Sequence, residues 1–126
     1  MHITTQGLVL RETSYKEADK ILTVLTREGG KRTVKARGCR RKNSPLAASA
    51  QLLVWSDMTL FEYRDYFTLN EAEALELFWG VRQDVEKLAL CSYFAEVTEL
   101  VAEEGSPDAG LLPLILNSMY ALDKLK

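Results

Sequence analysis

The residues of this 126-residue chain that could do chemistry are mainly cations. Residues 29–56 carry seven Lys or Arg side chains and no Asp or Glu, whereas residues 57–126 carry 5 Lys or Arg against 14 Asp or Glu. Solvated surfaces normally interleave both signs, so an acid-free stretch of this length indicates an anionic partner. Concentrated Lys and Arg neutralise phosphates and release counterions, which is the chemistry of sequence-independent nucleic-acid binding.

The spacing of these cations predicts a row of positive charge. The alternation in residues 32–38 predicts a half-buried strand, and residues two apart on a strand share a face at about 7 Å spacing. The expected row comprises Lys31, Lys35 and Arg37 on the strand and Arg40, Arg41 and Lys42 in the loop that follows. Composition alone leaves open the alternative of a solvated strand face followed by a basic loop.

Two tyrosines near the predicted turns are candidates for stacking on nucleic-acid bases. Tyr15 lies in a polar segment, and Tyr66 follows the probable turn Arg64-Asp65. Aromatic rings beside a positive groove bind single strands by stacking, at roughly 1–3 kcal/mol per base. Trp55 and Phe67 are interpreted instead as packing residues of the core or its rim.

Residues that could support catalysis or metal binding are few. His2 is the single histidine and lies at the terminus, while Glu17 and Asp19 are best explained as turn or capping residues. Cys39 precedes two arginines, which could depress its thiol pKa, but no orienting base is apparent. Cys39 and Cys91 form neither a zinc site nor a disulfide framework. We therefore predict no catalytic residues, no metal and no cofactor, and expect a reducing cytoplasm.

The first half of the chain is typical of a small β-barrel. Five strands are predicted within about 70 residues, an arrangement that favours a small barrel or a sandwich. The predicted strands are 3–11, 21–27, 32–38, 52–63 and 66–71. Gly29-Gly30 predicts a two-residue hairpin, and residues 46–51 one helical turn. A five-stranded Greek-key barrel is the OB-fold, so the predicted fold class is α+β, with an OB-fold over residues 1–77.

The second half, residues 78–126, predicts helices of an incomplete α-helical domain. Apolar periodicity favours helices over 81–104 and 108–125, with Ser106 and Pro107 opening the second. A helix apolar nearly all round is normally buried in a bundle, so further helices or a partner copy are expected to cover it. Leu114 and Leu116 are the predicted partner-binding positions. The uncharged run 109–122 is too short to span a membrane.

Six segments, taken in order, resemble the amino-terminal domain of the RecO family of bacterial recombination mediators. They are Gly7-Leu-Val-Leu-Arg11, Tyr15-Lys-Glu17-Ala-Asp19-Lys-Ile-Leu-Thr23, Leu25-Thr-Arg-Glu-Gly-Gly-Lys31, Ala36-Arg-Gly38-Cys-Arg40-Arg-Lys-Asn-Ser44, Leu60-Phe61 with Tyr66-Phe67-Thr-Leu-Asn-Glu71-Ala-Glu73, and Phe78-Trp-Gly-Val-Arg82-Gln-Asp84. The resemblance implies an OB-fold followed by a helical domain. It also implies a non-enzymatic protein that binds single- and double-stranded DNA, anneals strands and helps to load the recombinase.

The resemblance implies partners and site residues as well. The implied partners are RecR and the single-stranded-DNA-binding protein, at the cytoplasmic nucleoid. By position, Arg37, Arg40, Arg41 and Lys42 match the basic DNA-binding segment of the family. RecO proteins run to about twice this length, and many carry a four-cysteine zinc motif in the part that is absent here, so no zinc is predicted. Two alternatives stay open, namely a protein-interaction adaptor using its apolar helices and an RNA-binding OB module.

Overall fold

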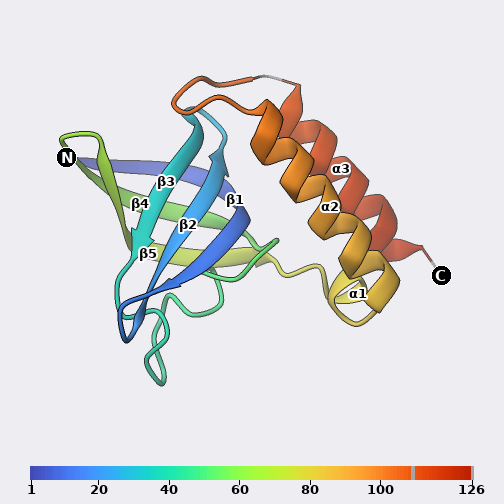
Figure 1. Cartoon of the computed structure of the whole chain (residues 1–126), viewed down its shortest axis with the longest axis horizontal. Coiled ribbons are helices and arrows are strands. Elements are labelled where there is room, and N and C mark those ends of the chain that lie inside the picture. Colours follow the sequence, from blue (N-terminus) through green and yellow to red (C-terminus); the bar gives the residue numbers. More distant parts are fainter. Residues whose placement is uncertain (109, 126) are drawn as a thin grey trace.

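The chain forms a closed five-stranded barrel with helices on one side (Figure 1). This computed structural model describes residues 1–108 and 110–125. The strands are β1 (His2–Tyr15), β2 (Asp19–Thr26), β3 (Gly30–Ala36), β4 (Trp55–Tyr63) and β5 (Tyr66–Glu76). The helices are α1 (Trp79–Arg82), α2 (Val85–Val101) and α3 (Leu111–Lys124).

The strand order is that of an OB-fold. Around the barrel the order is β1-β2-β3-β5-β4, and β4 pairs with β1 to close it. All pairings are antiparallel except that between β3 and β5, where Val34 lies opposite Phe67 and Lys35 opposite Thr68. The predicted five-stranded OB-fold is thereby confirmed.

The boundaries of β1 and β4 differ from the prediction. β1 continues to Tyr15, so the predicted loop over 13–20 shrinks to a turn at residues 16–18. β4 begins at Trp55 rather than at residue 52, because Leu53 has φ +67° and leaves the extended conformation. Leu53 N–H donates to the Val9 carbonyl at 2.8 Å instead, beside the irregularity in β1.

The two hairpin turns also differ in how well they were predicted. Arg64 and Asp65 have φ +50° and +67° and form the predicted turn between β4 and β5. In the other hairpin Thr26 pairs with Gly30, so the turn is formed by residues 27–29. Gly30 has φ +69° and already belongs to β3, so the predicted two-residue Gly29-Gly30 turn is wrong in register.

Two hydrophobic clusters stabilise the fold. One fills the barrel and includes Val9, Leu22, Val34 and Met58. The other lies between the barrel and the helices, where Leu8, Leu10 and Trp55 meet Phe78, Val81, Ile115 and Met119. Because the second cluster joins both parts, the helices are packed firmly on the barrel. The predicted division of the chain after residue 77 stays a prediction.

The helices begin and end at other residues than predicted. The expected helix over 81–104 is divided, because Asp84 is extended and its carboxylate caps α2 by accepting the Lys87 N–H at 3.1 Å. The second helix begins at Leu111, and Ser106 does not cap it. Residues 103–106 instead lie along β3, where Gly105 N–H donates to the Lys31 carbonyl at 2.9 Å.

Candidate nucleic-acid interface

A groove opens on the barrel between the β1–β2 turn and the β4–β5 turn. It has a volume of about 470 Å³. Its lining residues are Tyr15, Ile21, Thr33, Lys35, Arg37, Asp65, Tyr66, Phe67 and Thr68. In OB-folds this face of strands 2 and 3, between these two loops, is where oligonucleotides and oligosaccharides bind. Four of the predicted site residues, two tyrosines and two cations, are therefore brought together in one groove.

The two tyrosines present aromatic surface at this groove. The Tyr15 side chain is 40% exposed and that of Tyr66 77% exposed. The Lys35 ammonium lies 5.1 Å and the Lys16 ammonium 5.3 Å from the centre of the Tyr15 ring. An exposed ring with two cations beside it is suited to a ligand that offers both a flat base and a phosphate. Lys16 was missed at the sequence level, although its place next to Tyr15 was the available signal.

The β3–β4 loop, residues 37–54, carries three further cations after Arg37 that are not among the residues lining the groove. Arg37, Arg40, Arg41 and Lys42 are all exposed. The loop leaves β3 against the β1–β2 turn, because the Asp19 carboxylate accepts the Gly38 N–H at 2.7 Å and the Ala18 carbonyl accepts the Arg40 N–H at 2.9 Å. The Arg40 guanidinium also donates to the Lys16 carbonyl at 3.4 Å, so Arg40 lies at the β1–β2 turn that flanks the groove.

These cations have no carboxylate partner within 4.0 Å among residues 1–108 and 110–125. The two ion pairs found there join Arg11 to Glu99 at 3.3 Å and Lys20 to Glu12 at 2.7 Å. Asp65 lines the groove without forming an ion pair that the structure records. The positive charge of the groove and of the β3–β4 loop is therefore available to an external anion.

Lys31 does not extend the row as expected. Its ammonium donates to the Glu99 carbonyl at the end of α2, at 2.9 Å. The adjacent edge of β3 is covered by the α2–α3 linker, where the Glu104 carboxylate accepts the Thr33 N–H at 3.1 Å. The open row consequently begins at Lys35. The alternation predicted for this strand agrees with the structure. The contact of Lys31 with α2 could not be predicted, because it joins residues 68 positions apart.

The cysteines are buried thiols. Burial raises the pKa of Cys39, and this outweighs the opposing effect of the Lys20 ammonium. The expected depression of the Cys39 pKa is therefore wrong, because desolvation penalises the thiolate more than nearby cations favour it. Burial likewise raises the pKa of Cys91. In the described part of the chain, no three His, Cys, Asp or Glu side chains cluster as metal ligands.

The two predicted partner-binding leucines have different surroundings. Leu114 is 64% exposed and lines an apolar groove of about 500 Å³ between α2 and α3, together with Tyr93, Val97 and Val101. Leu116 is only 9% exposed and packs in the cluster between barrel and helices, so its expected exposure is wrong. Over residues 1–108 and 110–125, no helix is long and apolar enough to cross a membrane.

Comparison with known sequences identifies the family. A family model described as "Recombination protein O N terminal" matches residues 1–78. The chain belongs to the RecO family. Proteins named DNA repair protein RecO from Acetivibrio thermocellus and Alkaliphilus metalliredigens are each 37% identical to it, over 123 and 124 residues. The RecO protein of Heliobacterium modesticaldum is 39% identical over 117 residues.

The alignments cover nearly all of this chain and about half of each RecO relative. They span 98% of this chain and 49% and 50% of the first two relatives, and 93% and 42% for the Heliobacterium protein. The chain thus spans about half the length of the curated relatives that it matches. The resemblance to RecO seen in the six ordered segments is confirmed, and it extends over both the barrel and the helices.

Proposed function

We propose that this chain is the DNA-binding part of a repair and recombination protein and acts without making or breaking a covalent bond. The observation that supports this most strongly is the convergence of Tyr15, Tyr66, Lys35 and Arg37 on one groove of an OB-fold. The cations of the β3–β4 loop, which have no carboxylate partner within 4.0 Å among the described residues, would extend the binding surface beyond Arg37. Relatives named for DNA repair point in the same direction.

The groove would bind a single strand by two cooperating interactions. Lys35, Arg37 and the loop cations would neutralise phosphates and release counterions, which gives affinity independent of sequence. Tyr15 and Tyr66 would stack on bases, which holds the strand without reading hydrogen-bond patterns. A phosphate backbone neutralised in this way repels a second strand less, so complementary strands could pair. Annealing is therefore the activity we assign to this surface.

The partners of the whole protein are a further part of this proposal. RecR, the single-stranded-DNA-binding protein and the loading of a recombinase follow from RecO membership rather than from a contact seen here. Single-stranded and duplex DNA would share the basic surface, since both present phosphates. The expected place of action is the cytoplasm, at the bacterial chromosome.

Titration of a labelled oligonucleotide at several salt concentrations tests this function. If five cations each neutralise one phosphate, the logarithm of the association constant should fall with the logarithm of salt concentration with a slope of about −3 to −4 for single-stranded DNA. A slope near zero would exclude the proposal. Competition with RNA of the same sequence separates a DNA-binding from an RNA-binding OB module, because only RNA offers 2′-hydroxyl groups.

Removal of the exposed ring of Tyr66 is expected to weaken single-strand binding without altering its salt dependence. Tyr66→Ala should lose about 1–3 kcal/mol of stacking, roughly 5- to 150-fold in affinity, with an unchanged salt slope. Tyr66→Phe should retain most of the affinity, because the ring stays. Tyr63→Ala is the matched control, since Tyr63 precedes the same turn and is exposed but does not line the groove. Equal losses for Tyr63→Ala and Tyr66→Ala would contradict stacking by Tyr66.

An adaptor function is the second candidate, and the apolar groove beside Leu114 favours it. Tyr93 and Val101 are each 60% exposed there. Contiguous exposed apolar side chains of this kind are typical of a protein–protein interaction site. Charge reversal of Arg40 and Arg41 distinguishes the two functions. A pure adaptor would keep its repair activity in that variant, whereas a DNA-binding protein would lose it.

A further inference from the structure

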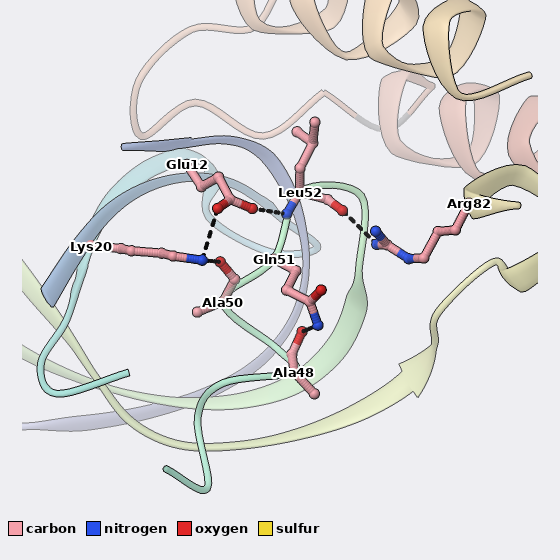
Figure 2. A network of polar contacts seen from close by, with 7 residues as sticks. All are labelled: Glu12, Lys20, Ala48, Ala50, Gln51, Leu52 and Arg82. Atoms are coloured by element: carbon pink, nitrogen blue, oxygen red, sulfur yellow. Dashed lines mark hydrogen bonds and ion pairs between the residues drawn. The ribbon is translucent and has the colours of Figure 1, made fainter. Parts of the chain in front are cut away.

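A polar network holds the returning end of the β3–β4 loop (Figure 2). Glu12 of β1 accepts the Leu52 N–H at 2.5 Å with one carboxylate oxygen and binds the Lys20 ammonium at 2.7 Å with the other. The Lys20 ammonium also donates to the Ala50 carbonyl at 3.3 Å. Two charged side chains of the barrel are thus used to hold main-chain atoms of the loop.

Arg82 of α1 holds the same segment from the side of the helices. Its Nη2 donates to the Leu52 carbonyl at 2.5 Å (Figure 2). Its Nε donates to the Leu77 carbonyl at 2.5 Å. Burial lowers the pKa of the Arg82 guanidinium, and the Glu12 carboxylate partly opposes this. Desolvation of a cation is costly unless its donors are satisfied, so these two carbonyl contacts define where Arg82 can lie.

The loop is therefore fixed at both of its ends. At the outgoing end, Gly38 and the Arg40 N–H are bound to the β1–β2 turn. At the returning end, Leu53 has φ +67°, a conformation that costs roughly 1–2 kcal/mol for a residue with a side chain. Such strain persists only where the surroundings over-determine it. The contacts to Leu52 on one side and to Val9 on the other supply that constraint.

We propose that Glu12, Lys20 and Arg82 are positioning residues for the cations of the β3–β4 loop. The inference rests on the proposed function, because it assumes that Arg40, Arg41 and Lys42 meet phosphates. When the loop is held against the barrel, one DNA strand can contact both the groove and these three loop cations. The contact from α1 makes the placement of the loop depend on the helices as well as on the barrel.

Glu12→Ala gives the sharpest test, because positioning and simple electrostatics predict opposite signs. Loss of an acid strengthens binding to a polyanion if only charge matters. Loss of the Leu52 and Lys20 contacts should instead release the loop and remove one or two phosphate contacts, so that single-strand affinity falls roughly 5- to 25-fold at about 0.1 M salt and the salt slope becomes shallower. Arg82→Lys should act in the same direction, because it keeps the charge but not the two-pronged donor.

A double-mutant cycle separates positioning from general destabilisation. In a background with Arg40, Arg41 and Lys42 all replaced by Ala, Glu12→Ala should cause no further loss of DNA affinity. Glu17→Ala is the matched control, because Glu17 is an exposed acid in the neighbouring β1–β2 turn. It should leave affinity unchanged or raise it. Circular dichroism and thermal melting of each variant confirm that binding is measured on folded protein.

The outcomes are distinct. Weaker binding by Glu12→Ala with a shallower salt slope, absent in the neutral-loop background, supports the positioning role. Unchanged or tighter binding, or an equal additional loss in that background, overturns it. If Glu12→Ala or Arg82→Lys does not fold, Lys20→Met decides through the cycle alone, because loss of a cation weakens DNA binding on electrostatic grounds as well. A loss that disappears in the neutral-loop background supports the positioning role, and an equal loss in both backgrounds overturns it. If the neutral-loop variant itself binds DNA like the unaltered chain, the proposed role of the loop in DNA binding fails instead.

Discussion

Replacing Arg37, Arg40 and Arg41 together by Ala is expected to weaken single-stranded DNA binding by roughly 100-fold at about 0.1 M salt. Each phosphate contact contributes about 0.7 to the salt slope, which corresponds to about fivefold in affinity at that salt concentration. Three lost contacts therefore give the expected loss, and the salt slope should become shallower by about 2. Fluorescence anisotropy titrations at four or more salt concentrations measure both quantities.

A second triple variant controls for net charge. Replacing Arg11, Lys87 and Lys124 by Ala removes the same formal charge from positions that do not line the groove. Its affinity should change by far less, because its charges lie outside the expected phosphate path and are partly screened over about 10 Å. Equal losses in the two triple variants would show that overall charge, and not the groove, determines binding. The groove variant changes only exposed residues, so its thermal midpoint should change little. The control variant loses the Arg11–Glu99 ion pair and the hydrogen bond from Lys87 to the Leu125 carbonyl, so thermal melting must show that it is folded before affinities are compared.

The barrel could be predicted because its determinants are local. The alternation of apolar and polar residues in residues 21–27 and 32–38 reports directly on which side chains enter the core. The ends of strands depended on longer-range contacts. β4 starts three residues later than the apolar run suggests, because Leu53 takes a left-handed conformation that is stabilised by pairing with Val9, 44 positions away.

The candidate site also contains residues that local sequence patterns predict and residues whose surroundings depend on long-range contacts. Tyr15 and Tyr66 were predicted from their places near loops or turns, and Lys35 and Arg37 from the alternation of their strand. All four line one groove. The surroundings of Lys31 and Leu116 could not be predicted from the sequence. Lys31 is bound by the end of α2, and Leu116 is buried in the cluster between the barrel and the helices. A helix that is apolar nearly all round does not reveal which of its leucines faces solvent. Cys39 was misjudged because neighbouring charges are visible in a sequence and burial is not.

Gly30→Ala is expected to destabilise the fold strongly, by about 2–5 kcal/mol. The added methyl group would overlap the backbone of Ser106, with its carbonyl carbon at 2.6 Å and its nitrogen at 2.9 Å. The φ of +69° at position 30 adds roughly 1–2 kcal/mol of strain for any residue with a side chain. Because small domains are stable by only about 5–15 kcal/mol, the urea midpoint should fall substantially.

Gly29→Ala is the matched control, one residue away. Gly29 is not among the residues of positive φ, and a methyl group there would meet the Arg32 Nε and Thr26 Oγ1 atoms, each at 3.0 Å. The Arg32 side chain can move, but Thr26 Oγ1 is held by hydrogen bonds with the Gly29 N–H and the Gly30 carbonyl. We therefore expect a loss of about 1–2 kcal/mol, smaller than that of Gly30→Ala because no backbone overlap and no φ strain are added. The methyl group added at position 30 would push the α2–α3 linker away from β3, and this would break the hydrogen bond from the Gly105 N–H to the Lys31 carbonyl. Gly30→Ala should therefore also increase the rate of hydrogen exchange at the Gly105 amide. Similar urea midpoints for the two variants would mean that the linker does not pack on β3 in solution.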